Sequence, residues 1–232
     1  MDDSNSFVYI EHTEILYFAR WYEMKIYSGD AENICIEEGI AIIIGAELKM
    51  CGVQRHFQSS DSVVCIPYEL RGTAKTVKMP DSVKHIGGKA FEHFGNLTEV
   101  TFSSSLETIG ISAFLNCDKL TTLHLPKSIK KIETWAFGNT KIENLYYDGT
   151  LFDADKIDTR GAFRGIGKLH CTDCVVDFDQ KQFYISEYEY KGTMAEWEAT
   201  MNEHWVYRRT AKVICSDGVI DNTITKKKGR KN

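Results

Sequence analysis

The fold is decided by the stretch Val77-Lys78-Met79-Pro80-Asp81-Ser82-Val83-Lys84-His85-Ile86-Gly87, which leads into Ala90-Phe91. Its apolar residues return at the same offsets 23 residues later, and again after another 23. A fixed period of this length predicts a solenoid of stacked structural units. The shared positions are Val77, Ile86 and Ala90-Phe91 in the first unit, Val100, Ile109 and Ala113-Phe114 in the second, and Leu123, Ile132 and Ala136-Phe137 in the third.

Each unit contains a strand with alternating apolar residues, at 97–102, 120–125 and 142–147. Alternate side chains of a strand point to opposite faces, so one set is buried and the other faces outward. One unit cannot cover its own apolar row, whereas stacked units close the rows into a shared core. Each fully buried apolar side chain contributes about 1.5–3 kcal/mol. The recurring phenylalanines predict an aromatic stack along the convex side.

The units resemble the BspA-like leucine-rich-repeat family, whose pattern is LP-x-S-(I/L/V)-x-x-I-G-x-x-A-F-x-x-C-x-x-L. Residues 79–87 and 125–132 carry the resemblance best, and Cys117 stands at the family's cysteine position. The match is close over 77–147 and looser over 39–221. It implies an α/β fold: a short leucine-rich-repeat solenoid with a parallel β-strand ladder, a short helical or irregular convex side, and capping elements at both ends. It also implies adhesion-like or host-matrix binding for exported members.

The chain divides into four segments around this repeat. Residues 1–62 form an aromatic segment and a capping hairpin, with a helix over 13–27 and two strands at 39–44 and 47–53 that flank Gly45-Ala46. Residues 63–146 form the leucine-rich-repeat solenoid. Residues 147–221 form a C-terminal capping segment, and 222–232 form a basic flexible tail.

The C-terminal segment is a tandem duplication of a pattern that begins Tyr-x-Gly-Thr and ends Cys-x-Asp-Gly or Cys-x-Asp-Cys, with copies starting at Tyr147 and Tyr190. In the second copy, Thr193 and Glu196 form a capping-box pattern that predicts the start of a helix. An apolar stripe on this helix, which includes Trp197, predicts packing against the last strand. A ligand-binding aromatic patch is the alternative.

Composition and charge exclude several classes of protein. The formal net charge is −5 and the isoelectric point is near 5.8, which argues against nucleic acid as a partner. The acidic N-terminus lacks an export signal, and the longest aliphatic run, Ile40–Ile44, is too short to span a membrane. The seven cysteines are therefore interpreted as reduced, and the cytoplasm is the default compartment unless a leader is missing.

The strongest chemical motif is His170-Cys171-Thr172-Asp173-Cys174, because two cysteines at this spacing can bind zinc. A tetrahedral site needs a second pair, which the sequence lacks. Asp153 to Asp158 begins like a calcium loop but lacks its glycine and final glutamate, and indicates the charged start of a helix instead. The sequence thus predicts no catalytic residue, metal or cofactor. A small metal-dependent or thiol enzyme using His170, Cys171 and Cys174 remains the alternative.

The outward strand positions form a mixed polar strip on the concave face, which is the candidate binding surface. His124 and Tyr146 are the expected anchors, because aromatic groups dominate binding hot spots. The sequence favours a non-enzymatic protein that binds another protein, or a glycan, through this strip. A merely solvated strip and a self-associating module are the alternatives. The oligomeric state does not follow from the sequence. The strip consists of Lys78, Glu99, Thr101, Thr122, His124, Asn144 and Tyr146.

Overall fold

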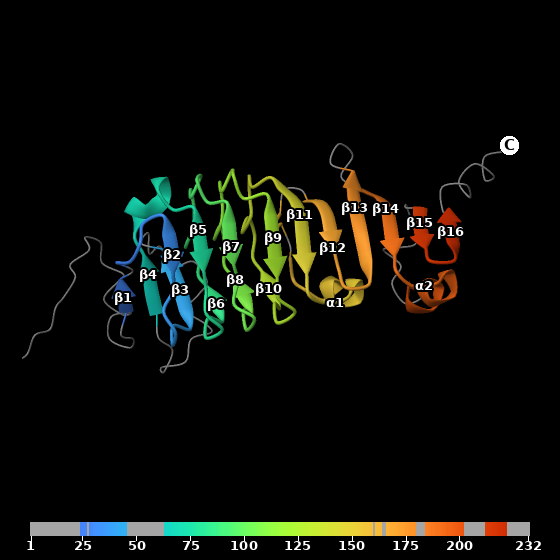
Figure 1. Ribbon diagram of the computed structural model, residues 1–232, viewed down its shortest axis with the longest axis horizontal. Coiled ribbons are helices and arrows are strands. Elements are labelled where there is room, and N and C mark those ends of the chain that lie inside the picture. Colours follow the sequence, from blue (N-terminus) through green and yellow to red (C-terminus); the bar gives the residue numbers. More distant parts are fainter. Residues whose placement is uncertain are drawn as a thin grey trace, which may run out of the picture.

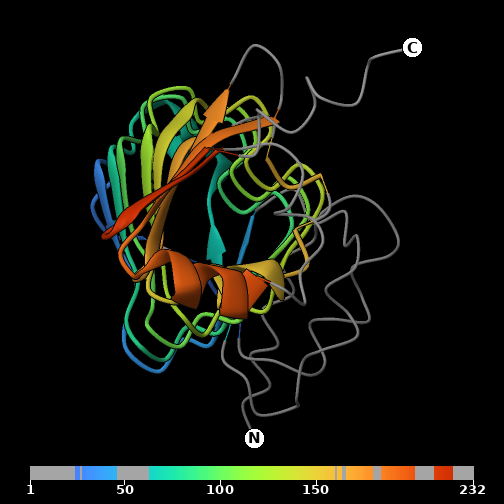
Figure 2. The same cartoon turned by 90° about the vertical axis from the view of Figure 1, so that its right-hand side faces the viewer.

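The computed structural model describes residues 24–26, 28–45, 63–159, 161–163, 166–179, 184–201 and 212–221. The described chain winds into an elongated array of stacked turns, with its strands side by side along the long axis (Figure 1). Seen from one end, the strands line one side of the turns and loops close the other (Figure 2). This is the predicted leucine-rich-repeat solenoid, with little helix.

The front ladder continues across two hydrogen-bonded sheets. The first sheet is parallel and the second is mixed, because β13 pairs antiparallel with both of its neighbours and β16 pairs antiparallel with β15. Strand β9 follows β7 along the array (Figure 1). The first sheet contains β2 (Asn33–Cys35), β5 (Thr76–Lys78) and β7 (Glu99–Thr101), and the second contains β9 (Thr122–Leu125), β11 (Ile142–Tyr147), β12 (Ile166–His170), β13 (Cys174–Asp179), β14 (Tyr184–Tyr190), β15 (Lys212–Cys215) and β16 (Gly218–Asp221).

A second ladder of very short parallel strands runs beside the first. In each of the three repeats, this ladder contains a strand of two residues. The second residue of the strand is an isoleucine, and it is buried. Every repeat therefore contributes two strands joined by a turn. The second ladder is ordered β1 (Met24–Ile26), β4 (Val63–Ile66), β3 (Ile42–Gly45), β6 (His85–Ile86), β8 (Thr108–Ile109) and β10 (Lys131–Ile132).

The phenylalanines stack through the core as predicted. Successive ring centroids are 5.1 Å apart from Phe91 to Phe114, 5.2 Å from Phe114 to Phe137 and 5.0 Å from Phe137 to Phe163, with interplanar angles of 13° or less. The backbone N–H of Phe114 donates to the carbonyl oxygen of Ala136, at 2.7 Å, and the other units repeat this bond. Stacking and backbone pairing therefore fix each repeat on the next, and Phe163 extends the stack beyond the third unit.

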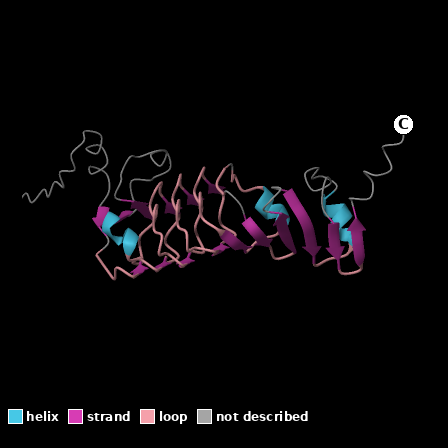
Figure 3. Ribbon diagram, turned by 90° about the horizontal axis from the view of Figure 1, so that it is seen from above, coloured by secondary structure: helices cyan, strands magenta, loops and turns pink. Residues whose placement is uncertain are grey.

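The loop side turns through left-handed backbone at the same two places in each unit. The first place holds Lys89, Ser112 and Trp135, with φ between 55° and 61°, and the second holds His93, Asn116 and Asn139, with φ between 56° and 65°. Asparagine tolerates this conformation better than most residues. The Asn139 amide also donates to Asn116 at 2.8 Å, which links neighbouring turns. These turns reverse the chain without the helices of longer leucine-rich repeats (Figure 3).

The duplicated C-terminal element folds twice in the same way. Helices α1 (Leu151–Asp155) and α2 (Met194–Met201) lie at one edge of the array (Figure 1). Capping boxes formed by Thr150 with Asp153, and by Thr193 with Glu196, begin them, so the predicted box is confirmed. Trp197 is buried, so it packs inward, but its ring partners Tyr188 and Tyr190 stand on β14, the strand before the helix, and not on the last strand.

The N-terminal segment differs from the sequence expectation where the structure describes it. Residues 24–26 form strand β1, parallel to β4, so the helix predicted over 13–27 is wrong at its end, and its remainder lies outside the described residues. Strand β3 pairs in parallel with both β4 and β6. It thus lies inside the repeat ladder, and the expected hairpin partner at 47–53 lies outside the described residues. A buried apolar run such as 42–44 suits a central parallel strand.

Candidate functional site on the strand face

The outward positions of the front ladder fall into two parallel rows of side chains. We name the first the ring row; it follows the direct strand partners Lys78 and Thr101, then His124, Tyr146, His170, Val175 and Glu189. His124 lies 23 residues after Thr101, on the next strand. The second row, the amide row, contains Thr76, Glu99, Thr122, Asn144 and Lys168. The inward residues between them, such as Val77 and Leu123, are buried.

All seven predicted site residues therefore lie on one face. Lys78, Glu99, Thr101 and His124 are exposed, and Thr122, Asn144 and Tyr146 are half-buried. Four of them lie on the ring row, strand by strand from its first strand to its centre: Lys78, Thr101, His124 and Tyr146. The seven residues together form one continuous outer surface of the front ladder.

Three rings of the ring row stack on one another. The centroid of the Tyr146 ring lies 4.5 Å from that of His124 and 4.4 Å from that of His170, with interplanar angles of 8° and 14°. These separations match the spacing of neighbouring strands, about 4.8 Å, because each ring stands on its own strand. Both faces of Tyr146 are thus covered by imidazoles. The stack presents ring edges and polar ring atoms outward rather than open ring faces.

His170 is held in the stack by more than its ring contact. Its Nε2 lies 3.0 Å from Oδ1 of Asn144, so the protonated nitrogen donates to the amide oxygen. Burial lowers the pKa of His170 below its usual value, Lys168 lowers the pKa further, and Glu189 opposes the shift. The imidazole is therefore biased toward its neutral form, which stacks against Tyr146 without carrying a charge into a half-buried position.

Sequence reasoning missed His170 and Lys168 as members of this face. Leu169 lies opposite the buried Leu145, so its two neighbours in the strand point outward. Tyr146 is opposite His170, and Asn144 is opposite Lys168. The adjacent cysteine motif drew His170 into the metal hypothesis instead.

Comparisons with known proteins identify the repeat. Residues 56–169 match the family model described as a BspA type leucine rich repeat region, in 6 copies. The central part of the chain is a BspA-type leucine-rich-repeat region. The stacked phenylalanines and the two strand ladders are the structure of these copies.

Outside the family model, the matches are sparse. The chain is similar to the solved structure of a leucine rich cell surface protein from Faecalibacterium prausnitzii A2-165, at 20% identity and a TM-score of 0.40. The match covers 74% of this chain and 36% of that protein, so this chain spans about a third of its length. No curated protein matches the chain.

The alternative of an enzyme depends on His170, Cys171 and Cys174. The structure places these residues in two different environments. His170 stands on the outer face against Tyr146, whereas Cys171 and Cys174 are buried. Burial raises the pKa of Cys171 to about 12 and raises that of Cys174 as well, which keeps both thiols protonated. Over the described ranges, no three His, Cys, Asp or Glu side chains are grouped as a metal-ligand set. The three residues are not brought together as a site.

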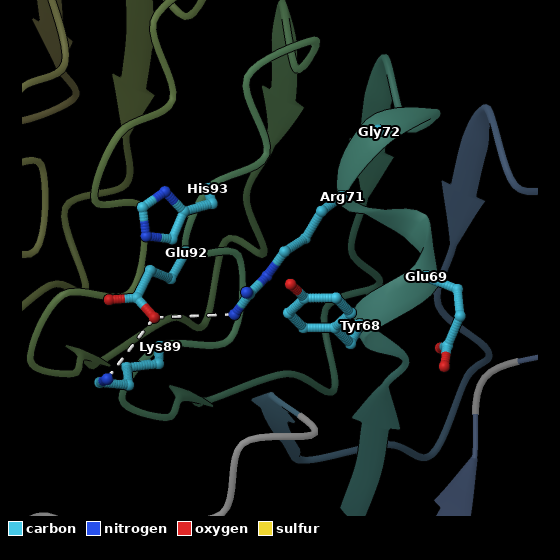
Figure 4. A pocket seen from close by; sticks show the side chains of 7 residues that line it. All are labelled: Tyr68, Glu69, Arg71, Gly72, Lys89, Glu92 and His93. Carbon is cyan, nitrogen blue, oxygen red and sulfur yellow. Dashed lines mark ion pairs between the residues drawn. The ribbon is translucent and has the colours of Figure 1, made fainter.

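A pocket on the loop side holds a separate charged cluster (Figure 4). The buried carboxylate of Glu92 lies 3.6 Å from Nη2 of Arg71 and 3.5 Å from Nζ of Lys89, and the Arg71 guanidinium lies 4.1 Å from the Tyr68 ring centroid. One repeat later, Leu115 occupies the position of Glu92. The cluster ties the 3₁₀ helix at Tyr68–Gly72 to the first full repeat. Tyr68, Glu69, Arg71, Gly72, Lys89, Glu92 and His93 line the pocket.

Proposed function

We propose that this chain is a non-enzymatic protein that binds another protein through the strand face, with the His124–Tyr146–His170 stack at the centre of the contact. The observation that carries the proposal is the stack itself. Three aligned rings on an outer face are rigid and hold little conformational entropy that binding would remove, which is the property of residues that dominate protein interfaces.

The geometry of the rings supports a protein over a glycan. Sugars commonly contact the open faces of aromatic side chains, but both faces of Tyr146 are already occupied by the two imidazoles. What the stack offers outward is edges, a phenol hydroxyl and imidazole nitrogens. These groups suit the mixed polar and apolar surface of a protein partner.

The surroundings of the stack give it the composition of a protein interface. Thr122 and Asn144 on the amide row supply hydrogen-bonding groups beside the rings, and Val175 continues the ring row as an apolar neighbour. Lys78 and Glu189 place opposite charges at the two ends of the row. A central aromatic cluster with polar and charged groups around it is the usual arrangement of specific interfaces.

We retain the cytoplasm as the compartment within this proposal. Among the described residues, Cys117, Cys171, Cys174 and Cys215 are buried cysteines with free thiols. Thiols in this state suit a reducing environment. None of the helices in the described ranges has the length and hydropathy needed to cross a bilayer.

Affinity capture from native cell extract tests the proposal with a charge-matched pair of variants. His124→Glu combined with Tyr146→Glu adds two negative charges on the stack, whereas Lys141→Glu changes the net charge equally at an exposed position outside both rows. We expect the double variant to lose a partner that wild type and Lys141→Glu retain, with thermal unfolding of all three preserved. Retention of the partner by the double variant would place the binding site elsewhere. A glycan-array signal lost in the same variant would replace the protein partner by a glycan.

A further inference from the structure

We infer that the pocket beside the first full repeat is a saccharide-binding site. In it, the Glu92 carboxylate accepts a hydrogen bond from one sugar hydroxyl, and Arg71 and Lys89 donate to the hydroxyls on either side. The pocket lies on the loop side (Figure 4), so the site is separate from the strand face and does not depend on the proposed function. Its volume of about 750 Å³ is within the roughly 300–1,000 Å³ usual for pockets that bind small ligands.

Glu92 is a departure from the repeat pattern. At the same position the second repeat has Leu115 and the third has Gly138, so the stacked fold does not require a charged side chain there. The Glu92 side chain is nevertheless only 8% exposed. Removing an ionised carboxylate from water is unfavourable unless hydrogen bonds compensate for the lost hydration. A buried charge that the following repeats do without indicates a role other than packing.

The Glu92 carboxylate keeps unused hydrogen-bonding capacity. Its Oε2 atom lies 3.6 Å from Nη2 of Arg71 and 3.5 Å from Nζ of Lys89, beyond the about 2.7–3.2 Å of ordinary N–H hydrogen bonds. In the part of the chain that the structure describes, these two ion pairs are the only polar contacts of the carboxylate. A carboxylate has about four lone-pair positions, so this one can accept hydrogen bonds from a ligand in the pocket that it lines.

The groups around Glu92 are hydrogen-bond donors. Arg71 and Lys89 approach its carboxylate oxygen from different sides (Figure 4). Nδ1 of His93 accepts from the side-chain amide of Asn116 at 3.2 Å, which leaves the Nε2 proton of the neutral ring as a further donor. The pocket therefore presents one buried acceptor with donors on either side of it.

This order of groups matches contiguous hydroxyls on a sugar ring. A hydroxyl can donate and accept at once, and neighbouring hydroxyl oxygens on a ring lie about one hydrogen-bond length apart. The middle hydroxyl of three can donate to Oε2 of Glu92. The outer two can then accept from Arg71 and Lys89, whose nitrogens lie at nearly equal distances from that oxygen.

The charges of the site favour a neutral ligand. A ligand cation would meet Arg71 and Lys89, and an anion that bridged these two would come close to the Glu92 carboxylate. Like charges repel strongly in a partly buried site, because salt and water screen them less there than on an open surface. A ligand that carries hydroxyl groups and no charge avoids both kinds of repulsion.

Titration of the full chain with glucose, followed by ligand-observed NMR, tests the inference, because the glucose ring carries three contiguous hydroxyls. We expect wild type to bind glucose with a Kd of about 1–20 mM, and to bind acetate, the anionic probe, more weakly. Glu92→Leu and Lys89→Ser introduce the residues that Leu115 and Ser112 provide in the second repeat. Each should weaken glucose binding at least about ten-fold. Glu143→Gln, which removes an exposed carboxylate of β11 outside the pocket, should leave the Kd unchanged.

Thermal unfolding of the same variants separates binding from folding. Both substitutions copy a stacked repeat, so both variants should stay folded, and Lys89, with its side chain 39% exposed, provides the test if Glu92→Leu unfolds. The inference would be overturned by a wild type that fails to bind glucose up to about 0.1 M, by unchanged binding in a folded variant, or by acetate binding more tightly than glucose.

The two sites can be shown to fail or stand separately. The double variant of the strand face, His124→Glu with Tyr146→Glu, should bind glucose as wild type does. Glu92→Leu should in turn keep the protein captured through the strand face. Loss of glucose binding in the double variant would place the saccharide on the strand face and overturn the inference.

Discussion

Phe114 lies at the centre of the stacked core. Phe91 and Phe137 cover the two faces of its ring, and the Phe102 ring meets it edge-on, with the centroids 5.8 Å apart. Phe114→Ala would leave a cavity that these neighbours cannot close. We expect the free energy of unfolding to fall by about 3–5 kcal/mol, measured by urea denaturation. Trp135→Ala, at a ring that is 42% exposed, is the control and should cost far less. Equal losses in the two variants would contradict a stacked core.

His170 should make the stability of the chain depend on pH near neutrality. Its pKa is lowered in the folded protein by burial and by Lys168. The unfolded chain therefore binds more protons as the pH falls through the usual histidine range, near 6.5, and stability should decrease between about pH 7.5 and 5.5. His170→Gln keeps a polar side chain but does not titrate, so it should lose less stability over this interval in thermal unfolding experiments.

The choice of pH interval separates this effect from carboxylate titration. The pKa values of Asp81, Asp153 and Glu107 are lowered by hydrogen bonds, so these groups lose their protons well below the interval. The other histidines are present in both proteins. An identical decrease in wild type and His170→Gln would show that the lowered pKa of His170 has no effect on folding.

Among the elements, the two C-terminal caps show how a duplicated sequence repeats its hydrogen bonds. Oδ1 of Asp173 accepts from the backbone N–H of Leu151, at 2.9 Å, and Oδ1 of Asp217 accepts from that of Met194, at 2.8 Å. Each helix thus has an aspartate from the following hairpin at its first N–H group, where backbone donors lack helical partners. This contact joins every helix to the strand that comes after it.

Removing the aspartate of the second cap should loosen α2 without disturbing the repeats. We expect Asp217→Ala to speed amide hydrogen exchange over residues 194–201, because it removes an acceptor that satisfies the helix N-terminus. Exchange in 77–137 should stay at the wild-type rate. Glu198→Ala, on the exposed side of α2, is the matched control. Unchanged exchange in α2 would mean that the capping box alone holds the helix start.

The elements that the sequence predicted are those with strong local patterns. The front strands of the repeats carry alternating apolar residues, and Thr193 with Glu196 marks a helix start directly. Strands β6, β8 and β10 have two residues each, too short for any period to appear. The apolar spacing over 13–27 predicts a helix, whereas residues 24–26 form strand β1, because pairing with β4 is a tertiary contact that overrides local propensity.

At the scale of the whole molecule, the strand face exists only after the turns are stacked. His124, Tyr146 and His170 are separated in sequence by more than twenty residues at each step, and the strand register brings them into contact. The outward positions could be predicted from the repeat offsets, as seven of them were. The stacking of the rings could not, because it depends on side-chain orientation across three strands and on continuing the register through the diverged fourth copy.

The regular spacing of the array also explains why its face can serve binding while its core serves stability. Inward residues such as Leu123 are fully buried, whereas their outward neighbours are exposed or half-buried. Substitutions on the two sides should therefore have separate effects. Those on the strand face should change association with little change in unfolding, and those in the phenylalanine stack should do the reverse.

The most direct test of the central claim, that the strand face meets a protein partner, is site-specific photo-cross-linking in cells. A photoreactive amino acid is placed at Thr122, beside the ring stack, or at Lys141, outside both rows. We expect a discrete protein adduct from position 122 and none from position 141. An adduct that forms only from position 141 would contradict the claim.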